Sequence, residues 1–544
     1  MVAGLLFHFK EPAVTRHFSW FSAALLLPLL GWVGLIPLLL VYPIYGDELQ
    51  WKLINSRLLL DSGKLLYLFP GCAKGVSLDP PISWYPLQLI GATIYSDMTN
   101  PQVLRYWAIA TFIAIILYCA WFVRFKLRPV IGYAATIGAV LAPLSLGVLP
   151  FLLVLNRPEQ GLVLVLVCAC TIPSVFGDRK LTILQAWMVA VLFILLCWIA
   201  VSTHVKGVFL LPALLLAAFL AIRRWLPSLA VLAAAGFGAM ETLRLWSIRT
   251  DCPESPFLMQ VFRDQSLSPK DLSSGLVHFL RLALRNAVNM DAYWRNAGFQ
   301  EEYQSLWLPP ADAPQTMIAT ILNSAIPVSI AIGAVFIIAA FVFSTARAIK
   351  SRTLPDNGPL IGITLLACLV GISAFQSGKN FYESALILPV FAMAVMFALT
   401  TTALPTAALF GGRKTMALLA VLALANQLTI AFRFYPNFSA WQQTLNERQP
   451  KQDTVRRLLG RCGIEANATS KHLLVDEFTY TLLWRTQEPY FLALVDGWWA
   501  TGLDQTHIIQ DRNITGVVGA CRLVSTKIWT SIISEGGFCC AKRP

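Results

Sequence analysis

Residues 19–50 read SWFSAALLLPLLGWVGLIPLLLVYPIYGDELQ, and this stretch decides the class of fold. Residues 19–42 are almost entirely apolar, and a helix needs about 20 such residues to cross a bilayer. The run is too long for the apolar core of a signal peptide, about 7–15 residues, and no clear cleavage pattern of small residues follows it. We therefore expect an uncleaved membrane anchor.

The composition extends this expectation to the whole chain. The sequence is 57% hydrophobic and 13% charged, with a mean hydropathy of +0.64, whereas soluble domains carry about 25% charged residues. The net charge of +13 would suit a nucleic-acid-binding protein if the chain were soluble. Its basic residues instead form short clusters between apolar runs, which is typical of membrane orientation signals. The sequence thus predicts a multi-pass membrane protein that does not bind nucleic acid.

Eleven apolar runs are candidates for transmembrane helices, and the loops between them fall alternately on two sides. The runs lie near residues 19–42, 104–123, 130–154, 161–176, 183–202, 207–222, 227–246, 316–345, 359–375, 383–403 and 415–433. The side that holds the N-terminus carries fourteen Lys or Arg residues against three acids, Glu11, Asp178 and Asp356. An excess of Lys and Arg marks the cytoplasmic side, so we expect a cytoplasmic N-terminus, in the inner or plasma membrane if the host is bacterial.

The opposite side, periplasmic or lumenal, receives every large segment. Outer loops at residues 43–103 and 247–315 belong to a transmembrane domain that covers residues 1–433, and a soluble domain follows at 434–544. This tail reads as a small α/β unit, with a helix and three short buried strands expected at residues 441–459, 472–476, 491–495 and 514–518. The predicted fold class is an α-helical polytopic membrane protein with a small C-terminal α/β domain on the outer side.

The cysteines divide in the same way. Five lie inside predicted spans: Cys119, Cys168, Cys170, Cys197 and Cys368. Six lie on the outer side, where disulfides persist: Cys72, Cys252, Cys462, Cys521, Cys539 and Cys540. Six cysteines allow fifteen pairings, and the sequence does not choose among them.

Two adjacent carboxylates, Asp47 and Glu48, stand where the first apolar run ends. Asp47 with Gln50 three residues later fits a capping box at the start of a new helix. A carboxylate pair that opens a long loop at the membrane boundary is also a candidate for chemistry. The two interpretations are compatible, because a carboxylate that caps a helix can still accept a proton.

Motifs of other enzyme classes are missing from the sequence. It contains no HExxH, CxxC pair or His-rich cluster, which argues against a zinc enzyme. Residues 377–380, SGKN, lack the earlier glycine and the Ser or Thr of a P-loop. Charged residues remain at the outer ends of the spans: Arg157, Glu159, His204, Lys206, and Lys379 with Glu383. Each alone is more commonly an interfacial anchor or a structural ion pair. Together they place cations and carboxylates at the same depth in the membrane. The cations can hold a phosphate, and a carboxylate can act as a base.

This plan resembles the GT-C glycosyltransferases, membrane enzymes that use polyprenyl-phosphate sugars, such as protein O-mannosyltransferases and lipid A aminoarabinose transferases. The resemblance rests on the uncleaved first helix, Asp47-Glu48 at the start of the first outer loop, the many spans and the soluble tail. It implies that Asp47 is the catalytic base with Glu48 as its neighbour. By position, Arg157, Lys206 and Lys379 match the basic residues that bind the carrier phosphate, and Glu159 and His204 are further candidates for substrate binding.

The function expected from this resemblance is transfer of a monosaccharide, hexosyl or pentosyl, from a polyprenyl-phosphate donor to a hydroxyl group. The acceptor is a glycan, lipid or protein, the reaction inverts the anomeric carbon, and the pathway is glycan biosynthesis in the cell envelope. Neither a metal nor another cofactor is expected, since Arg and Lys can neutralise a monophosphate. Alternatives are an O-antigen-type polymerase or ligase, a non-catalytic subunit, and a transporter or lipid flippase. The last is disfavoured because no internal repeat is visible and charges inside the spans are few.

The orientation is testable by cysteine labelling. A thiol introduced at Phe125 or Leu127, beside Lys126 in a basic loop, should react with an impermeant reagent only from the cytoplasmic side. Labelling of these positions from outside intact cells would overturn the orientation and with it the predicted place of catalysis.

Overall fold

The computed structural model describes most of the predicted spans and much of the tail. The described residues are 20–42, 48, 56, 59–60, 63, 65–66, 77–78, 85–96, 102–127, 133–176, 181–249, 266–267, 269–289, 313–379, 383–400, 406–464, 472–483, 490–492, 509 and 514–543.

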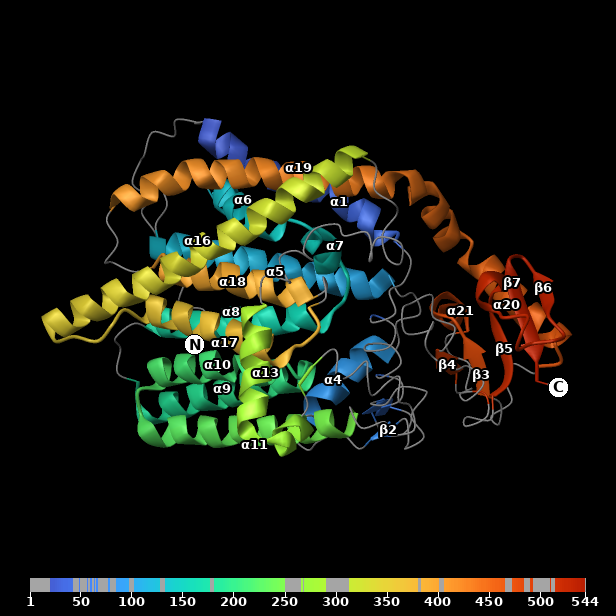
Figure 1. The fold of residues 1–544 in the computed structure, drawn as a ribbon, viewed down its shortest axis with the longest axis horizontal. Coiled ribbons are helices and arrows are strands. Elements are labelled where there is room, and N and C mark those ends of the chain that lie inside the picture. The colour runs from blue at the N-terminus through green and yellow to red at the C-terminus, as the bar shows by residue number, and fades with distance from the viewer. Residues whose placement is uncertain are drawn as a thin grey trace.

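Long apolar helices packed side by side make up most of the protein (Figure 1). In this part of the chain the α-helices are α1 (Trp20–Leu40), α4 (Tyr85–Ser96), α5 (Gln102–Leu127), α6 (Tyr133–Leu144), α7 (Leu149–Val154), α8 (Pro158–Phe176), α9 (Ile183–Thr203), α10 (Gly207–Ile222), α11 (Trp225–Arg249), α13 (Leu276–Val288), α16 (Ala313–Ser351), α17 (Asn357–Phe375), α18 (Ser384–Ala398), α19 (Thr406–Asn446), α20 (Arg448–Arg461) and α21 (Glu477–Leu482). The 3₁₀ helices are η2 (Pro269–Ser274) and η4 (Cys521–Leu523).

The predicted membrane architecture is confirmed. Within the described ranges, eight helices are long and apolar enough to cross a membrane, and three shorter apolar helices, α6, α10 and α18, accompany them. These helices coincide with the eleven apolar runs of the sequence. Many of their large apolar side chains point outward, for example Ile332 and Val335 on α16, as expected of helices that face lipid.

One predicted span, at residues 130–154, is broken into two helices. Pro143 lies in the last turn of α6, and the chain turns through residues 145–148 before α7 begins. The carbonyl oxygens of Ser145 and Gly147 accept hydrogen bonds from Asn426 Nδ2 of α19, at 2.8 and 2.9 Å. Backbone groups freed inside a bilayer need such partners, so α19 makes the break possible.

The C-terminal domain contains a five-stranded sheet of order β4-β3-β5-β7-β6. The strands are β3 (His472–Val475), β4 (Tyr490–Leu492), β5 (Ile514–Ala520), β6 (Ile533–Glu535) and β7 (Phe538–Lys542), while β1 (Leu65–Leu66) and β2 (Ser77–Leu78) pair separately. β3 is parallel to β4 and β5, and β7 is antiparallel to β5 and β6. The three predicted strands correspond to β3, β4 and β5, whereas β6 and β7 were not predicted.

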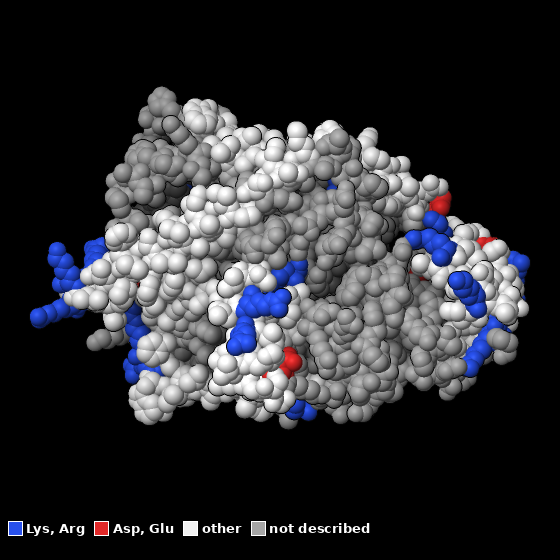
Figure 2. Space-filling model, in the orientation of Figure 1, with Lys and Arg blue, Asp and Glu red and all other residues white. Residues whose placement is uncertain are grey.

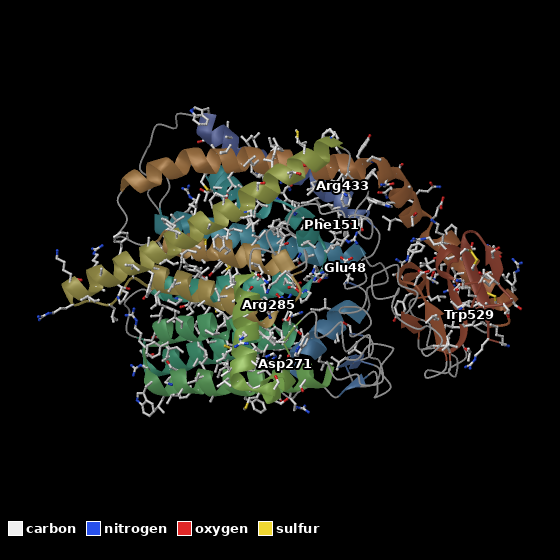
Figure 3. All side chains as sticks on the ribbon, viewed as in Figure 1. Glu48, Phe151, Asp271, Arg285, Arg433 and Trp529 are labelled. Atoms are coloured by element: carbon white, nitrogen blue, oxygen red, sulfur yellow. A yellow bond between two sulfur atoms is a disulfide. The ribbon has the colours of Figure 1, made fainter. Side chains whose placement is uncertain are left out.

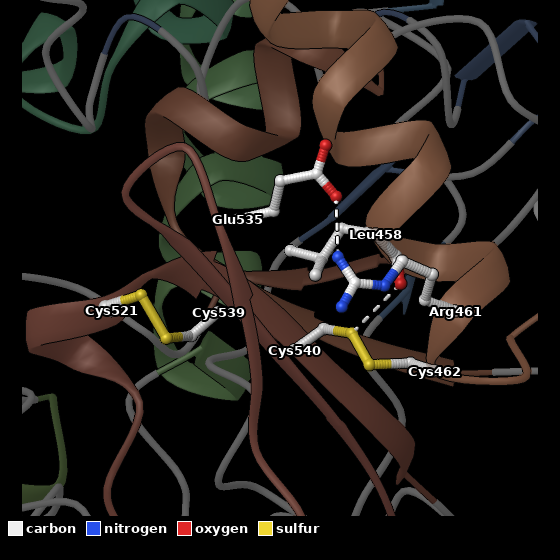
Figure 4. The surroundings of a disulfide bond; sticks show 7 residues. All are labelled: Leu458, Arg461, Cys462, Cys521, Glu535, Cys539 and Cys540. Carbon is white, nitrogen blue, oxygen red and sulfur yellow. Dashed lines mark hydrogen bonds and ion pairs between the residues drawn. A yellow bond between two sulfur atoms is a disulfide. The ribbon is translucent and has the colours of Figure 1, made fainter.

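Two disulfides support this domain (Figure 4). Cys462, just after α20, is bonded to Cys540 of β7, and Cys521 of η4 is bonded to Cys539 of the same strand. The first bond closes a separation of 78 residues, which restricts the unfolded chain strongly. Four of the six cysteines predicted on the outer side are thus paired, while Cys72 and Cys252 lie outside the described residues. The five cysteines within the spans are free thiols.

Basic side chains gather at one end of the helical bundle. Figure 2 shows Lys and Arg side chains projecting from the end opposite the C-terminal domain. Basic residues there include Arg124 and Lys126 in the last turn of α5 and Lys350 in the last turn of α16. At the other end, α19 continues past the last predicted span as a single helix of 41 residues and leads directly into α20.

Candidate active site

A buried ion pair joins the first outer loop to the bundle. Glu48 is 1% exposed and Arg105, in the first turn of α5, is 2% exposed. Arg105 Nη2 lies 2.9 Å from Glu48 Oε2, and Arg105 Nε donates to Glu48 Oε1 at 3.2 Å. Arg105 Nη1 also donates to the carbonyl oxygens of Leu39 and Tyr42 at the end of α1. The guanidinium therefore ties the first span, the first outer loop and the start of α5 together.

The same carboxylate holds the segment between α7 and α8. The backbone N–H of Asn156 donates to Glu48 Oε1 at 3.0 Å, and Asn156 Nδ2 donates to the carbonyl oxygen of Leu104 at 2.7 Å. Both oxygens of Glu48 thus accept hydrogen bonds from buried donors, so the carboxylate is already engaged in holding the structure together. Asp47, the other predicted catalytic residue, lies outside the described residues.

Next to Asn156 begins a second buried charge network. Arg157 Nε lies 3.2 Å from Glu159 Oε2, Lys206 Nζ lies 3.3 Å from Glu159 Oε1, and Lys206 also forms an ion pair with Glu383. All four residues are at most 5% exposed. Four charges buried this deeply require one another, because removing one partner of a buried pair costs about 3–5 kcal/mol.

Local sequence explains how these residues reach one place. Pro158 starts α8, so Arg157 stands just before the helix and Glu159 in its first turn, where the helix dipole favours a negative charge. Lys206 ends the tight turn between α9 and α10. A Cβ atom at the next residue, Gly207, would lie 2.1 Å from the carbonyl oxygen of Ala200, so only glycine fits there.

Two further predicted residues support this arrangement. His204 ends α9, and its Nδ1 accepts a hydrogen bond from the backbone N–H of Lys206 at 3.1 Å. Lys379 donates to the carbonyl oxygens of Ser373 and Gln376 at the end of α17. Burial lowers the pKa of Lys379 to about 8, although the nearby carboxylate of Glu383 acts in the opposite direction.

The structure thus brings Arg157, Glu159 and Lys206 into direct contact and places His204 and Lys379 beside them. Figure 3 places Glu48 at the end of the bundle nearer the C-terminal domain, together with Phe151 of α7 and Arg433 of α19. Among the described residues, no group of three His, Cys, Asp or Glu side chains could hold a metal ion. The role of each residue in substrate binding stays a prediction.

Two residues of the site were not predicted, Arg105 and Asn156, and Glu383 was noted only as a charge beside Lys379, without a role. Arg105 and Glu383 each stand within the first turn of an apolar run, and a charge in that position is a recognisable signal of a buried partner. Asn156 acts through its backbone N–H as well as its amide, and a main-chain contact leaves no signal in the sequence.

The fold is similar to that of two membrane glycosyltransferases. The structure of ArnT from Cupriavidus metallidurans bound to undecaprenyl phosphate matches with a TM-score of 0.43 and 12% identity, over 96% of this chain and 98% of that one. The oligosaccharyltransferase of Archaeoglobus fulgidus, tethered to an acceptor peptide, matches with a TM-score of 0.40 and 11% identity, over 92% of this chain and 69% of that one.

The archaeal enzyme also matches in its complex with an inhibitory peptide and dolichol-phosphate, with a TM-score of 0.37. Both neighbours are GT-C membrane glycosyltransferases. No model of a protein family matches the chain, and no curated protein does. The function proposed below therefore rests on the geometry of the site.

A double-mutant cycle tests the coupling between Glu48 and Arg105. Glu48→Leu or Arg105→Met alone leaves a buried charge without its main partner and should cost about 3–5 kcal/mol of stability. The double variant removes both charges and should cost clearly less than the sum of the two. Unfolding of the purified protein in detergent measures all three. Arg457→Met, at an exposed pair with Glu535, serves as a control that should change stability by at most about 1 kcal/mol. A loss of stability in the double variant equal to the sum of the two single losses would contradict the coupling.

Proposed function

We propose that the protein is a glycosyltransferase that moves a monosaccharide from a polyprenyl-phosphate donor to a hydroxyl acceptor. The observation that carries this proposal is the buried network of Arg157, Glu159, Lys206 and Glu383 next to the Glu48–Arg105 pair. Buried cations at the end of a membrane bundle suit the phosphate of a lipid whose hydrocarbon chain remains in the bilayer. The acceptor is a glycan, a lipid or a protein.

The donor phosphate binds at Arg157 and Lys206. Lys206 contacts two carboxylates, so it can keep Glu159 while a phosphate oxygen replaces Glu383. This exchange conserves the charge around Lys206 and therefore avoids the cost of leaving a buried ammonium alone. Glu159 holds both cations in place, and His204 fixes the turn that carries Lys206.

Asp47 is the general base, and Glu48 positions it. Arg105 and Asn156 fix Glu48 near the end of α1 and the charge network, and Asp47 is its neighbour in the sequence. The acceptor oxygen forms a bond to the anomeric carbon as the bond from that carbon to the phosphate oxygen breaks. The hydroxyl proton passes to Asp47. The electron pair of the broken bond stays on the polyprenyl phosphate, whose charge Arg157 and Lys206 stabilise. A single displacement of this kind inverts the anomeric carbon.

The reaction takes place on the side that carries the C-terminal domain, which we assign to the periplasm or lumen. The basic end of the bundle then lies in the cytoplasm (Figure 2). A donor in the outer leaflet and a water-borne acceptor can both reach this end of the bundle.

The substitution Asp47→Asn tests the proposed base. Asn caps a helix about as well as Asp but does not accept a proton at neutral pH, so the variant should fold and insert normally. A general base contributes about 100- to 10,000-fold in rate, and sugar transfer from the donor lipid should slow by at least about a hundredfold. A transfer assay with purified protein in nanodiscs measures this rate. Near-normal transfer by Asp47→Asn would assign Asp47 to capping and place the base elsewhere.

The lowered pKa of Lys379 predicts a pH dependence. In the protein without donor, the ammonium of Lys379 is charged below about pH 8 and loses its charge above it. If that charge helps to bind the donor, kcat/KM for the donor should fall as the pH rises through about 8. Lys379→Arg is the matched control, because a guanidinium stays charged throughout this range. The same decline of kcat/KM in the wild type and in Lys379→Arg would show that Lys379 does not help to bind the donor.

A further inference from the structure

Helix α13 lies across the membrane helices. Figure 1 shows its axis roughly perpendicular to those of α9, α10 and α11, which run side by side. Three hydrogen bonds fix it to the end of α17: Ser373 Oγ donates to the carbonyl oxygen of Asn286 at 3.1 Å, and Asn286 Nδ2 donates to Ala374 O at 3.2 Å and to Ser377 Oγ at 3.3 Å. Since α17 ends at Phe375, α13 lies at the depth where a spanning helix leaves the bilayer.

The side chains of α13 divide into three arcs around its axis, at about 100° per residue. The arc that packs on the bundle is half-buried and contains Phe279, Leu282, Ala283 and Asn286. A second arc is apolar and exposed, with exposed fractions of 61% for Leu276, 73% for Val277, 55% for Leu280, 66% for Leu284 and 73% for Val288. The third arc is polar, exposed and basic: His278, Arg281 and Arg285.

An exposed apolar arc of this size is unfavourable in water, at roughly 25 cal/mol for each Å² of apolar surface. This exposure to water is avoided if the helix lies in the interface of a bilayer. Its apolar arc then faces the acyl chains, and its arginines lie at the phosphates of the headgroups. Both the axis in the membrane plane and the depth set by α17 match that position. A second copy of the chain is a poorer occupant, because the basic arc beside the apolar one matches anionic headgroups but would meet its own like charges in a symmetric pair.

We infer that α13 is an interfacial membrane helix in the leaflet on the side of the C-terminal domain. Leu276, Leu280 and Leu284 enter the acyl region, and Arg281 and Arg285 bind headgroup phosphates. Figure 3 labels Arg285 on this helix. This inference does not depend on the proposed catalytic activity, since it follows from the position of α13 and the pattern of its side chains.

Fluorescence quenching in nanodiscs tests the inference. In the full chain with its unpaired thiols replaced, an environment-sensitive fluorophore is attached at Leu280→Cys. The matched control carries it at Arg285→Cys, on the polar arc of the same helix. The nanodiscs contain phosphatidylcholine and phosphatidylglycerol with brominated acyl chains. At Leu280 we expect strong quenching by the bromines and protection from aqueous iodide. At Arg285 we expect stronger quenching by iodide than by the bromines. Val277→Cys repeats the lipid-facing measurement if Leu280→Cys does not fold.

Three outcomes would overturn the inference. Quenching by iodide at both Leu280 and Val277 would place the apolar arc in water. Protection from both quenchers would show that protein covers it. Loss of bromine quenching at Leu280 when unbrominated donor lipid is added, with protection from iodide retained, would identify the donor chain as the occupant.

Discussion

The ion pair between Glu48 and Arg105 is the contact on which the candidate site depends. Arg105 binds the carbonyl oxygens at the end of α1, and Glu48 accepts the N–H of Asn156, one residue before Arg157. The pair therefore sets the start of the first outer loop against the start of α5 and the charge network. Leu104, its neighbour in α5, belongs to an apolar cluster with Leu458 of α20, so the same turn of α5 also contacts the C-terminal domain.

The second constraint is charge balance among buried side chains. Two cations and two carboxylates, Arg157, Lys206, Glu159 and Glu383, lie buried with each other as their partners. Such a network is costly to assemble and adds little stability compared with an apolar core of the same size. We propose that it prepares the site for an anion, because the cations are already buried and oriented before a phosphate arrives. Carboxylates that balance them in the meantime can move aside.

Much of this architecture is predictable from the sequence, for physical reasons. Long apolar runs and one-sided basic loops report directly on the bilayer, and the alternating apolar residues of β3 and β5 report on a buried sheet. Arg157, Glu159 and Lys206 were recognisable because charges at span ends are few. Their pairing was not predictable, since it depends on how α8, α10 and α18 pack. The break between α6 and α7 depends on Asn426, far along the chain, and β7 follows a glycine turn in a segment with weak strand signals.

The central claim is that the buried network at Lys206 is the site of the carrier phosphate, and binding of a polyprenyl phosphate to the purified protein tests it most directly. Lys206→Met combined with Glu383→Gln removes the ammonium without leaving an extra unpaired charge. Loss of a charge-assisted hydrogen bond is worth about 1.5–3 kcal/mol, so this variant should bind roughly ten- to hundredfold more weakly than the wild type. Lys451→Met, at a partly exposed pair with Glu447, should bind like the wild type. Wild-type affinity in the Lys206→Met, Glu383→Gln variant would contradict the account.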